Sequence, residues 1–148
     1  MGIKIISKNK RAFYDFLITE RLEAGIQLQG TEVKSLREAQ VRIADAFVTI
    51  DERKEAWIHN LHISHYAFGN INNHVEGRKR KLLLNRKEID KLYHEMKSKN
   101  LTIIPISIYF KKSNVKVEIG LAKGKKLHDK RQDEAKKDAQ RKIRSGDY

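Results

Sequence analysis

The chain has 148 residues, and its 32 Lys and Arg residues outnumber its 19 Asp and Glu residues, which gives a formal net charge of +13. A chain of this length supports one hydrophobic core plus an appendage, and its excess positive charge favours a polyanionic partner such as nucleic acid. The absence of Cys excludes thiolate zinc sites and thiol nucleophiles, while the absence of a signal peptide and of an apolar run of about 18 residues predicts a cytoplasmic protein that binds no membrane.

The first forty residues are predicted to contain two helices with a strand between them. Asn9 is a candidate N-cap for a short first helix. The apolar residues that share one face of this helix are Ala12, Phe13, Phe16 and Leu17. Residues 15–29 follow a strand-like pattern, and residues 30–40 are typical of a second helix, with Thr31 as its candidate N-cap and Glu32 in its first turn.

The middle of the chain is predicted to form a hairpin followed by a long loop. Residues 44–63 show the alternation of two strands joined by a turn at residues 51–54. In this pattern Phe47 and Trp57 face away from their apolar neighbours. Residues 64–81 carry Gly and Asn without any periodicity, which indicates a loop, and loops of this length in small domains are usually functional or disordered.

A third helix and a second hairpin follow. Asn85 and Glu88 make a capping box at the start of the helix. The apolar residues on its inner face are Ile89, Leu92, Tyr93 and Met96. Residues 101–122 are predicted to form a hairpin that turns at residues 111–114, and Pro105 is expected at an edge or a bulge. The residues expected to pack inward are Ile104, Ile106, Ile108 and Phe110, opposite Val115, Val117, Ile119 and Leu121.

Five or six short strands with about three helices predict a mainly β fold of the α+β class, in which residues 1–122 form an antiparallel barrel of the oligonucleotide-binding (OB) type. Residues 123–148 make up a basic tail with too little apolar surface to offset its ordering entropy, so it is expected to be disordered when free. The tail nevertheless has a latent helical pattern, because Ala135, Ala139 and Ile143 recur every four residues. We therefore expect an RNA-binding arm that folds when it is bound.

The sequence offers little for catalysis or for metal binding. His59, His62 and His65 are three residues apart, but on a strand such positions point to opposite faces, so no metal site is predicted. Glu23 and Glu32 lie in more apolar surroundings than the other acids. The simplest interpretation of Glu32 is an acidic residue in the first turn of a helix. Glu23 is an acidic residue on a strand, where it can accept hydrogen bonds from nucleotides. We find no phosphate loop, hydrolase Ser elbow or His–Glu pair, and we predict a protein that is not an enzyme and needs no cofactor.

The basic residues point to RNA. Four consecutive cations stand just before a helix start, whose backbone N–H groups also favour anions. The candidate phosphate contacts in this run are Arg78, Arg80 and Lys81. Further candidates, which offer phosphate partners or stacking faces, are Lys8, Lys10, Arg11, Tyr14, Tyr66 and His74. For the four cations alone, solvated loop charge is an equally good interpretation.

Several blocks of sequence resemble, in order and spacing, the SmpB family, the tmRNA-binding proteins of bacterial trans-translation. The blocks are NKRAFYDF, EAGIQLQGTEVKSLR, RKRKLLLN and VKVEIGLAKGKKLHDKR, followed by the basic tail. This resemblance covers nearly the whole chain. It implies an OB-type fold that binds the tRNA-like domain of tmRNA and enters, with elongation factor Tu, ribosomes that are stalled without a codon in the A site. It also implies that the tail folds as a helix in the empty mRNA channel.

The same resemblance implies roles for particular residues. The implied tmRNA contacts are Glu23, Leu83 and Asn85. The residues implied to lie near 16S rRNA, at the decoding centre or in the mRNA channel, are Gly124, Lys125, Lys126, His128, Asp129, Lys130, Arg131, Lys136, Lys137 and Arg141. The chain departs from the usual family pattern at His65, where Pro is common, and at Val75 and Glu76, where Asp-Pro is common.

Two alternatives from other functional classes stay open on the residues alone. A small basic nuclease or RNA-modifying enzyme would turn over RNA when Mg²⁺ is added. A ribosomal protein with a basic extension would be recovered with one ribosomal subunit at full stoichiometry, including from translating ribosomes.

Overall fold

The computed structural model describes residues 3–68 and 73–124. In chain order the elements are β1 (Ile3–Lys8), α1 (Ala12–Asp15), β2 (Phe16–Ile26), α2 (Gly30–Arg37), β3 (Val41–Arg42), β4 (Phe47–Ile50), β5 (Ala56–His59), β6 (His62–Ile63), β7 (Arg80–Leu83), α3 (Arg86–Lys99), β8 (Thr102–Lys111) and β9 (Asn114–Gly124). Within these described ranges, no helix is long and apolar enough to cross a membrane.

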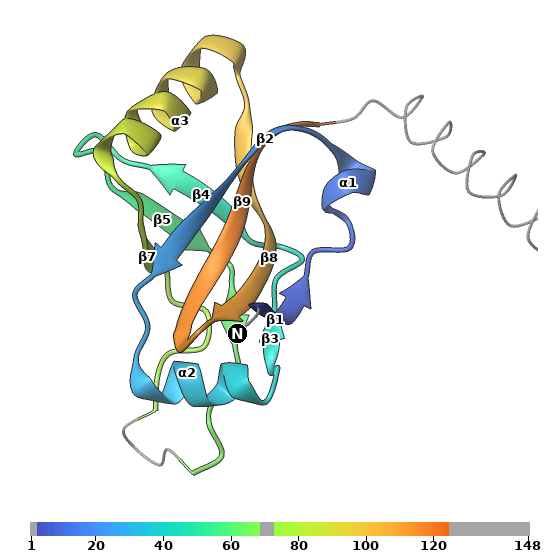
Figure 1. Ribbon diagram of the computed structural model, residues 1–148, viewed down its shortest axis with the longest axis vertical. Helices are drawn as coiled ribbons and strands as arrows, with labels where there is room; N and C mark the ends of the chain where they lie inside the picture. Colours follow the sequence, from blue (N-terminus) through green and yellow to red (C-terminus); the bar gives the residue numbers. More distant parts are fainter. Residues whose placement is uncertain (1–2, 69–72, 125–148) are drawn as a thin grey trace, which may run out of the picture.

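The main sheet has seven strands in the order β1-β8-β4-β5-β7-β2-β9, and all of its pairings are antiparallel. Because β9 also pairs with β8, the hydrogen bonds close six of the strands into a ring, and β1 lies beside β8 outside that ring. The helix α3 lies toward one end of the ring and α2 toward the other (Figure 1). These findings confirm the mainly antiparallel fold with three helices.

The interior of the ring is apolar, and the β8–β9 hairpin supplies much of it. Ile108, Val117 and Ile119 are fully buried, as predicted. Ile104 and Ile106 are also buried, but they lie outside the main cluster, because a β-bulge between Pro105 and Ser107 shifts the alternation of the strand. The main cluster thus contains Ile103. Ile104 packs with Ala12 and Ala122 in a second cluster under α1, and Ile106 lines a surface pocket. The predicted bulge near Pro105 is confirmed.

The helix starts differ from the prediction at α1 and α2. The first helix is only four residues long, and its N-cap is Arg11, so the assignment of Asn9 as the N-cap is wrong. Asn9 is buried instead, and its side chain bonds to β8. At α2 the N-cap is Gln29 rather than Thr31, and Gln29 forms a capping box with Glu32. A flexible Gln was not expected to cap a helix, because the preferred N-cap side chains are shorter.

The third helix and the first hairpin agree with the prediction. Asn85 and Glu88 exchange both hydrogen bonds of the capping box, with the Asn85 backbone N–H donating to Glu88 Oε1 at 3.1 Å and the Glu88 N–H donating to Asn85 Oδ1 at 2.9 Å. In the β4–β5 hairpin, Phe47 faces outward with 37% of its surface exposed, whereas Val48 is buried. Trp57 is half-buried and faces away from the fully buried Ile58.

Three strands were not predicted. These are β1, the two-residue strand β3, and β7, which begins inside the segment expected to be a loop. The predicted second strand of the first hairpin is divided into β5 and β6, and β6 pairs with β3. β3 and β7, with two and four residues, are too short to show an alternation in sequence. β1 has six residues, but its pairing partner β8 lies far away along the chain. Of these, β7 matters most for function, because it carries Leu83 and leads directly into the cap of α3.

Candidate nucleic-acid interface

Two cross-strand rows of residues define a surface on the outer side of β2, β9, β8 and β1, which we call the β2–β9 face. The first row consists of Leu83, Gly25, Lys116, Tyr109 and Ile5. The second row consists of Glu23, Glu118, Ser107 and Lys8. Paired residues on neighbouring strands project to the same side of a sheet. Three candidate RNA contacts that are far apart in sequence, Lys8, Glu23 and Leu83, therefore share one surface.

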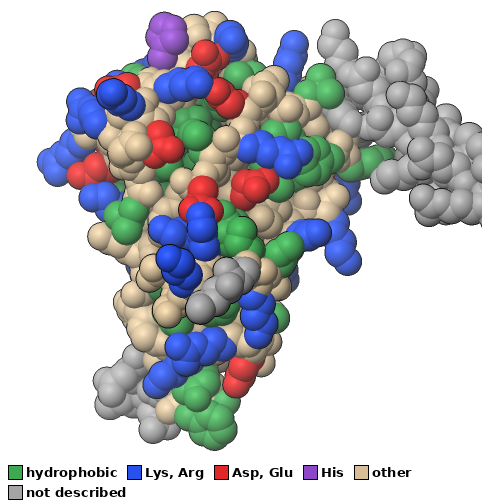
Figure 2. Space-filling model, viewed as in Figure 1, with side chains coloured by type: hydrophobic (Ala, Val, Ile, Leu, Met, Phe, Trp, Pro, Cys, Tyr) green, Lys and Arg blue, Asp and Glu red, His purple; other side chains and the backbone are tan. Residues whose placement is uncertain are grey.

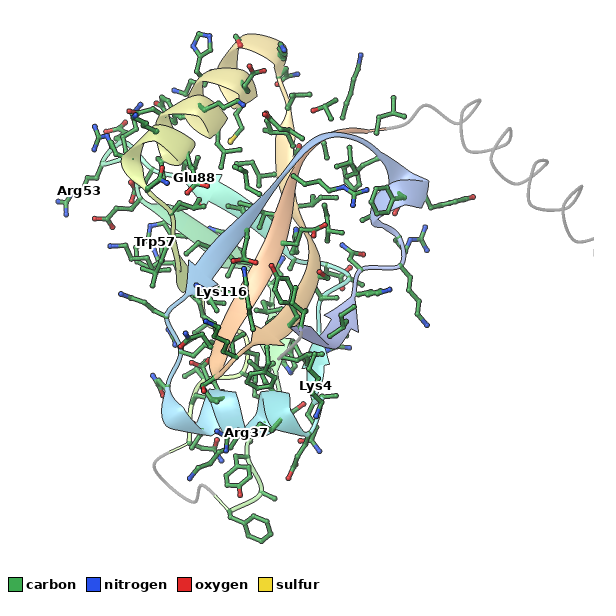
Figure 3. All side chains as sticks on the ribbon, in the orientation of Figure 1. Lys4, Arg37, Arg53, Trp57, Glu88 and Lys116 are labelled. Atoms are coloured by element: carbon green, nitrogen blue, oxygen red, sulfur yellow. The ribbon has the colours of Figure 1, made fainter. Side chains whose placement is uncertain are left out.

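The β2–β9 face has mixed character. Figure 2 shows basic, acidic and hydrophobic side chains interspersed over the side of the molecule on which β2 and β9 lie. Lys116 lies in the middle of this side, whereas Trp57 and Arg53 lie away from it, toward the β4–β5 hairpin (Figure 3). A surface of this kind can contact phosphates, riboses and unpaired bases, because the apolar and aromatic groups supply contact area between the charges.

Glu23 is held in place at the centre of the face. The Tyr109 hydroxyl donates to Glu23 Oε2, and Lys111 Nζ lies 3.4 Å from Oε1. The Tyr109 hydrogen bond is the main reason that the pKa of Glu23 is lowered, and Lys111 and Lys116 contribute further. Burial and the same bond to Glu23 raise the pKa of Tyr109. Glu23 is thus a fixed carboxylate that can accept hydrogen bonds from RNA amino or hydroxyl groups.

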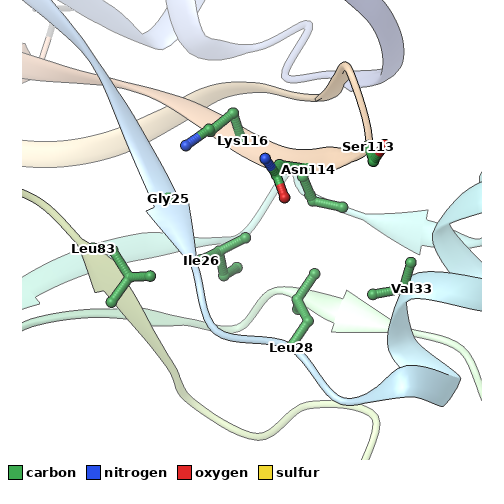
Figure 4. Close-up of a pocket in the computed structure, with 9 residues that line it drawn as sticks. Gly25, Ile26, Leu28, Val33, Leu83, Ser113, Asn114 and Lys116 are labelled. Carbon is green, nitrogen blue, oxygen red and sulfur yellow. The ribbon is translucent and has the colours of Figure 1, made fainter.

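Leu83 lies at one end of the face, over a shallow hollow of about 240 Å³ between β2, β7 and β9 (Figure 4). Its side chain is 48% exposed although it is large and apolar. Gly25 makes this position possible, because a Cβ at residue 25 would lie only 3.2 Å from the Leu83 Cβ. Lys116 lines the hollow on the other side. Leu83 therefore offers an apolar contact beside a cation, and Asn85, two residues further on, is exposed at the start of α3.

The N-terminal candidates gather at the opposite end of the face. Lys8 is exposed at the end of β1, and Lys10 and Arg11 follow in the turn into α1. Arg11 Nε lies 3.0 Å from Asp15 Oδ2, a bond that raises the pKa of Arg11, and the guanidinium lies 5.8 Å from the centroid of the Tyr14 ring. Because this ion pair is on the surface, it leaves the cation accessible to a phosphate.

Two of the predicted RNA contacts are buried. Arg80 has no exposed surface, and its guanidinium bonds inward to Glu32 and to the carbonyls of Leu61, Arg78 and Glu76, at 2.6, 2.9 and 3.0 Å for the carbonyls. His74 is also buried. Its Nδ1 lies 2.8 Å from the Thr31 hydroxyl, and its Nε2 lies 2.8 Å from the Ile63 carbonyl oxygen. In this conformation neither side chain can reach a phosphate. The prediction that Arg80 and His74 contact RNA directly is therefore replaced by a structural role, in which their buried hydrogen bonds stabilise the fold.

The other cations of the same run point outward. Because side chains alternate along a strand, Lys79 and Lys81 lie on the side opposite Arg80. Lys79 is exposed, with its Nζ 4.7 Å from the centroid of the Trp57 ring, and Lys81 Nζ lies 3.9 Å from Glu55 Oε2. Arg78 is partly exposed and pairs with Glu32. Lys79 and Lys81 are therefore the members of the run that are best placed to meet a phosphate.

Glu32, which was predicted from the sequence to be an acid in the first turn of a helix, is also the centre of a buried ionic network with Arg78 and Arg80. Burial alone would raise the pKa of Glu32, but the hydrogen bonds from Arg78 and from the Gln29 backbone N–H, together with Arg80, lower it. The network ties α2 to the segment that leads into β7. The network thereby helps to hold β7 and the start of α3, which carry Leu83 and Asn85, in position.

The remaining predicted sites lie elsewhere. His59 bonds to Thr49, whereas His62 and His65 share Glu76, with ring nitrogens 2.6 and 3.5 Å from its two carboxylate oxygens. Within the described ranges no group of three or more His, Cys, Asp or Glu side chains is placed to hold a metal ion. Tyr66 lies against α2, where Lys34 Nζ is 5.4 Å from its ring centroid. Gly124 ends β9 and is exposed. The predicted ribosomal contacts from 125 to 141 and the predicted tail helix lie outside the described residues.

Comparisons with known proteins agree on one family. The family model described as "SmpB protein" matches residues 6–146. An SsrA-binding protein of Pelobacter propionicus is 54% identical over 97% of this chain and 93% of its own length, and one of Mycobacterium leprae is 51% identical over 96% of this chain and 88% of its own length. A solved chain described under "tmRNA-SmpB: a journey to the center of the bacterial ribosome" has a TM-score of 0.68 and 43% identity, and covers 82% of this chain and 85% of its own.

Proposed function

The chain belongs to the SmpB family, and from this membership we propose that it binds the tRNA-like domain of tmRNA and delivers it to the A site of stalled ribosomes. It thereby serves ribosome rescue and peptide tagging in the cytoplasm. The observation that carries the proposal is the arrangement of Lys8, Glu23 and Leu83 in adjacent cross-strand rows of one face, in a chain whose relatives are SsrA-binding proteins.

The two ends of this face suit different parts of a folded RNA. The N-terminal end carries Lys8, Lys10 and Arg11 and can neutralise phosphates, which gives affinity but no sequence information. The other end offers an apolar side chain, Leu83, beside an exposed amide, Asn85. Between them Glu23, which Tyr109 and Lys111 hold in place, is expected to accept a further hydrogen bond from the RNA, because its negative charge would otherwise only repel the RNA backbone. The face thus selects the shape of an RNA rather than a sequence alone.

The tail serves the second step of the proposed function. Gly124 to Arg131 are proposed to lie near the decoding centre, and Lys136, Lys137 and Arg141 to contact 16S rRNA in the empty mRNA channel. A basic segment with a latent helical pattern can order against RNA while the body holds tmRNA. Neither task requires bond chemistry, so we propose a factor without enzymatic activity, which elongation factor Tu accompanies as part of the alanyl-tmRNA complex.

Binding of the isolated tRNA-like domain, measured by fluorescence anisotropy at several salt concentrations, tests the first step. Glu23→Gln should weaken binding with little change in the salt slope, whereas Lys8→Ala should shallow the slope by roughly 0.7–0.9. Glu52→Gln is the matched control, because Glu52 is an exposed acid in the β4–β5 turn, away from the face. Equal effects of the two Glu variants would refute a specific site at Glu23. Failure of the wild-type protein to prefer this RNA over an equal length of duplex RNA would refute the function.

A further inference from the structure

A pocket of about 360 Å³ opens at the N-terminal end of the β2–β9 face, between β1, α1, β2, β8 and β9. Its apolar lining is Ile5, Phe13 and Ile106, and its basic lining is Lys8, Lys10 and Arg21. Ile5 and Phe13 are 50% and 46% exposed. Exposed apolar side chains that lie together and are surrounded by polar groups are typical of interaction sites. Figure 1 shows α1 and β1 at the edge of the face where this pocket lies.

Phe13 and Arg21 stack on each other and together form one wall of the pocket. The Arg21 guanidinium lies 4.7 Å from the centroid of the Phe13 ring. The acidic residue that lines the pocket, Glu118, is paired with Arg21, with Nη1 3.6 Å from Oε1. Aromatic rings and Arg guanidinium planes are the surfaces on which proteins stack unpaired RNA bases. Phe13 is still 46% exposed, so a base can extend the stack that Phe13 and Arg21 already form.

Asn9 adds a hydrogen-bonding group at the same pocket. It is 7% exposed, its Nδ2 donates to the Pro105 carbonyl at 3.0 Å, and its backbone N–H donates to the Ile106 carbonyl at 2.8 Å. The Pro105 carbonyl fixes the amide orientation, since only Nδ2 can donate to it. Asn9 Oδ1 is then a buried acceptor that has no hydrogen-bond partner within the described part of the chain. A buried acceptor in this state is costly, and one at a binding pocket points to a donor on a ligand.

We propose that this pocket binds a single unpaired nucleobase that is turned out of the RNA and presents an N–H donor. The inference rests on the proposed function and adds to it a base-binding site at Phe13, Asn9 and Arg21. The base stacks on the wall of Phe13 and Arg21, its amino or imino group donates to Asn9 Oδ1, and the flanking phosphates lie against Lys8 and Lys10. Because Oδ1 is covered in the free protein, a flexible lining side chain such as that of Lys8 moves aside on binding.

The chemistry of the pocket favours RNA over the other partners that an exposed apolar patch can bind. An apolar protein segment would leave the cations at the rim unpaired and would give Asn9 Oδ1 no donor. A base with its own sugar and phosphate supplies a flat apolar surface, a donor and an anion together. Paired bases are excluded, because their donors are engaged and their faces are stacked.

Anisotropy with the tRNA-like domain of tmRNA and full-length variants tests the site. Phe13→Ala should weaken binding roughly 5- to 150-fold, the usual range for losing one stacked base, without changing the salt slope. Phe13→Tyr keeps a stacking ring and should restore binding. Phe47→Ala is the control, because Phe47 is an exposed Phe on the β4–β5 hairpin, outside this pocket. Equal affinity of Phe13→Ala and the wild type, or an equal loss in Phe47→Ala, would overturn the proposal.

A second measurement needs no variant. In nuclear magnetic resonance spectra of the wild-type protein, the side-chain amide of Asn9 and the ring of Phe13 should shift on addition of the same RNA. Unchanged signals at both positions, while the backbone around Glu23 shifts, would overturn the pocket and leave tmRNA binding in place. Absence of any shift, together with absence of binding by anisotropy, would remove the proposed function itself and the pocket with it.

Discussion

Replacing Arg80 by Met should destabilise the protein strongly and yet leave the salt slope of tmRNA binding unchanged. Arg80 and Glu32 are both fully buried and paired, so the substitution leaves a buried carboxylate with Arg78 as its remaining cation. It also removes the donors to the carbonyls of Leu61 and Glu76. Breaking a buried ion pair by removing one partner costs about 3–5 kcal/mol. For a domain of this size that cost lowers the melting temperature by roughly 10–20 °C.

The assay combines a thermal melt with the salt dependence of RNA binding. Melts followed by circular dichroism give the loss of stability, and anisotropy is measured at a temperature at which the variant is folded. Lys79→Ala is the matched control, because Lys79 is the exposed neighbour in the same run and should shallow the slope by roughly 0.7–0.9 with little effect on the melt. A melting temperature for Arg80→Met within about 3 °C of the wild type would refute the buried network. A slope reduced as in Lys79→Ala would show that Arg80 contacts phosphate after all.

Four further outcomes are expected. The pKa of Glu32 in the folded protein lies below its usual value of 4.5. The ionised carboxylate therefore stabilises the fold above pH 4.5, and this stabilisation is lost as the pH falls through the folded pKa. Melting temperatures of Glu32→Gln should depend less on pH below 4.5 than those of the wild type. Glu23→Gln should lower the pKa of Tyr109, measured by the ultraviolet absorbance of tyrosinate, and an unchanged titration would contradict the hydrogen bond. Asn85→Ala should cost about 1 kcal/mol of stability, because it removes the N-cap of α3, whereas Asn85→Ser should keep the cap. Weaker tmRNA binding by Asn85→Ser would therefore reveal a role of the Asn85 amide that is separate from capping. A chain that ends at Gly124 should keep β9, its melting temperature and most of its tmRNA affinity but fail to support peptide tagging, and full tagging would refute the division of labour between body and tail.

The sequence by itself determined the features that depend on local pattern and on composition. The capping box of Asn85 and Glu88 was readable because cap and helix are neighbours along the chain. The inward alternation of β9, from Val115 to Leu121, was readable because a long strand repeats its period several times. The excess of positive charge indicated a polyanionic partner. The order of the sequence blocks indicated the family, which the comparisons then confirmed.

Only the tertiary structure decided which charged residues are available to a partner. Arg78, Lys79, Arg80 and Lys81 look alike in sequence, but Arg80 alone is fully buried. Its partner, Glu32, is 48 residues away along the chain, and only the folded structure brings the two side chains together. A local pattern carries no information about such a pairing, since the group that offsets the cost of burying a charge can lie anywhere in the chain.

The same holds for the surfaces on which the proposed function depends. The two rows of the β2–β9 face join residues from five strands, and no spacing in the sequence marks that alignment. The bulge at Pro105 turns Ile106 toward the pocket, and the bond between the Pro105 carbonyl and Asn9 fixes the amide there. The sequence indicated which side chains have the chemistry to bind RNA, whereas the register of distant strands decided which of them meet on one surface, because strand pairing is set by long-range contacts and not by local propensity.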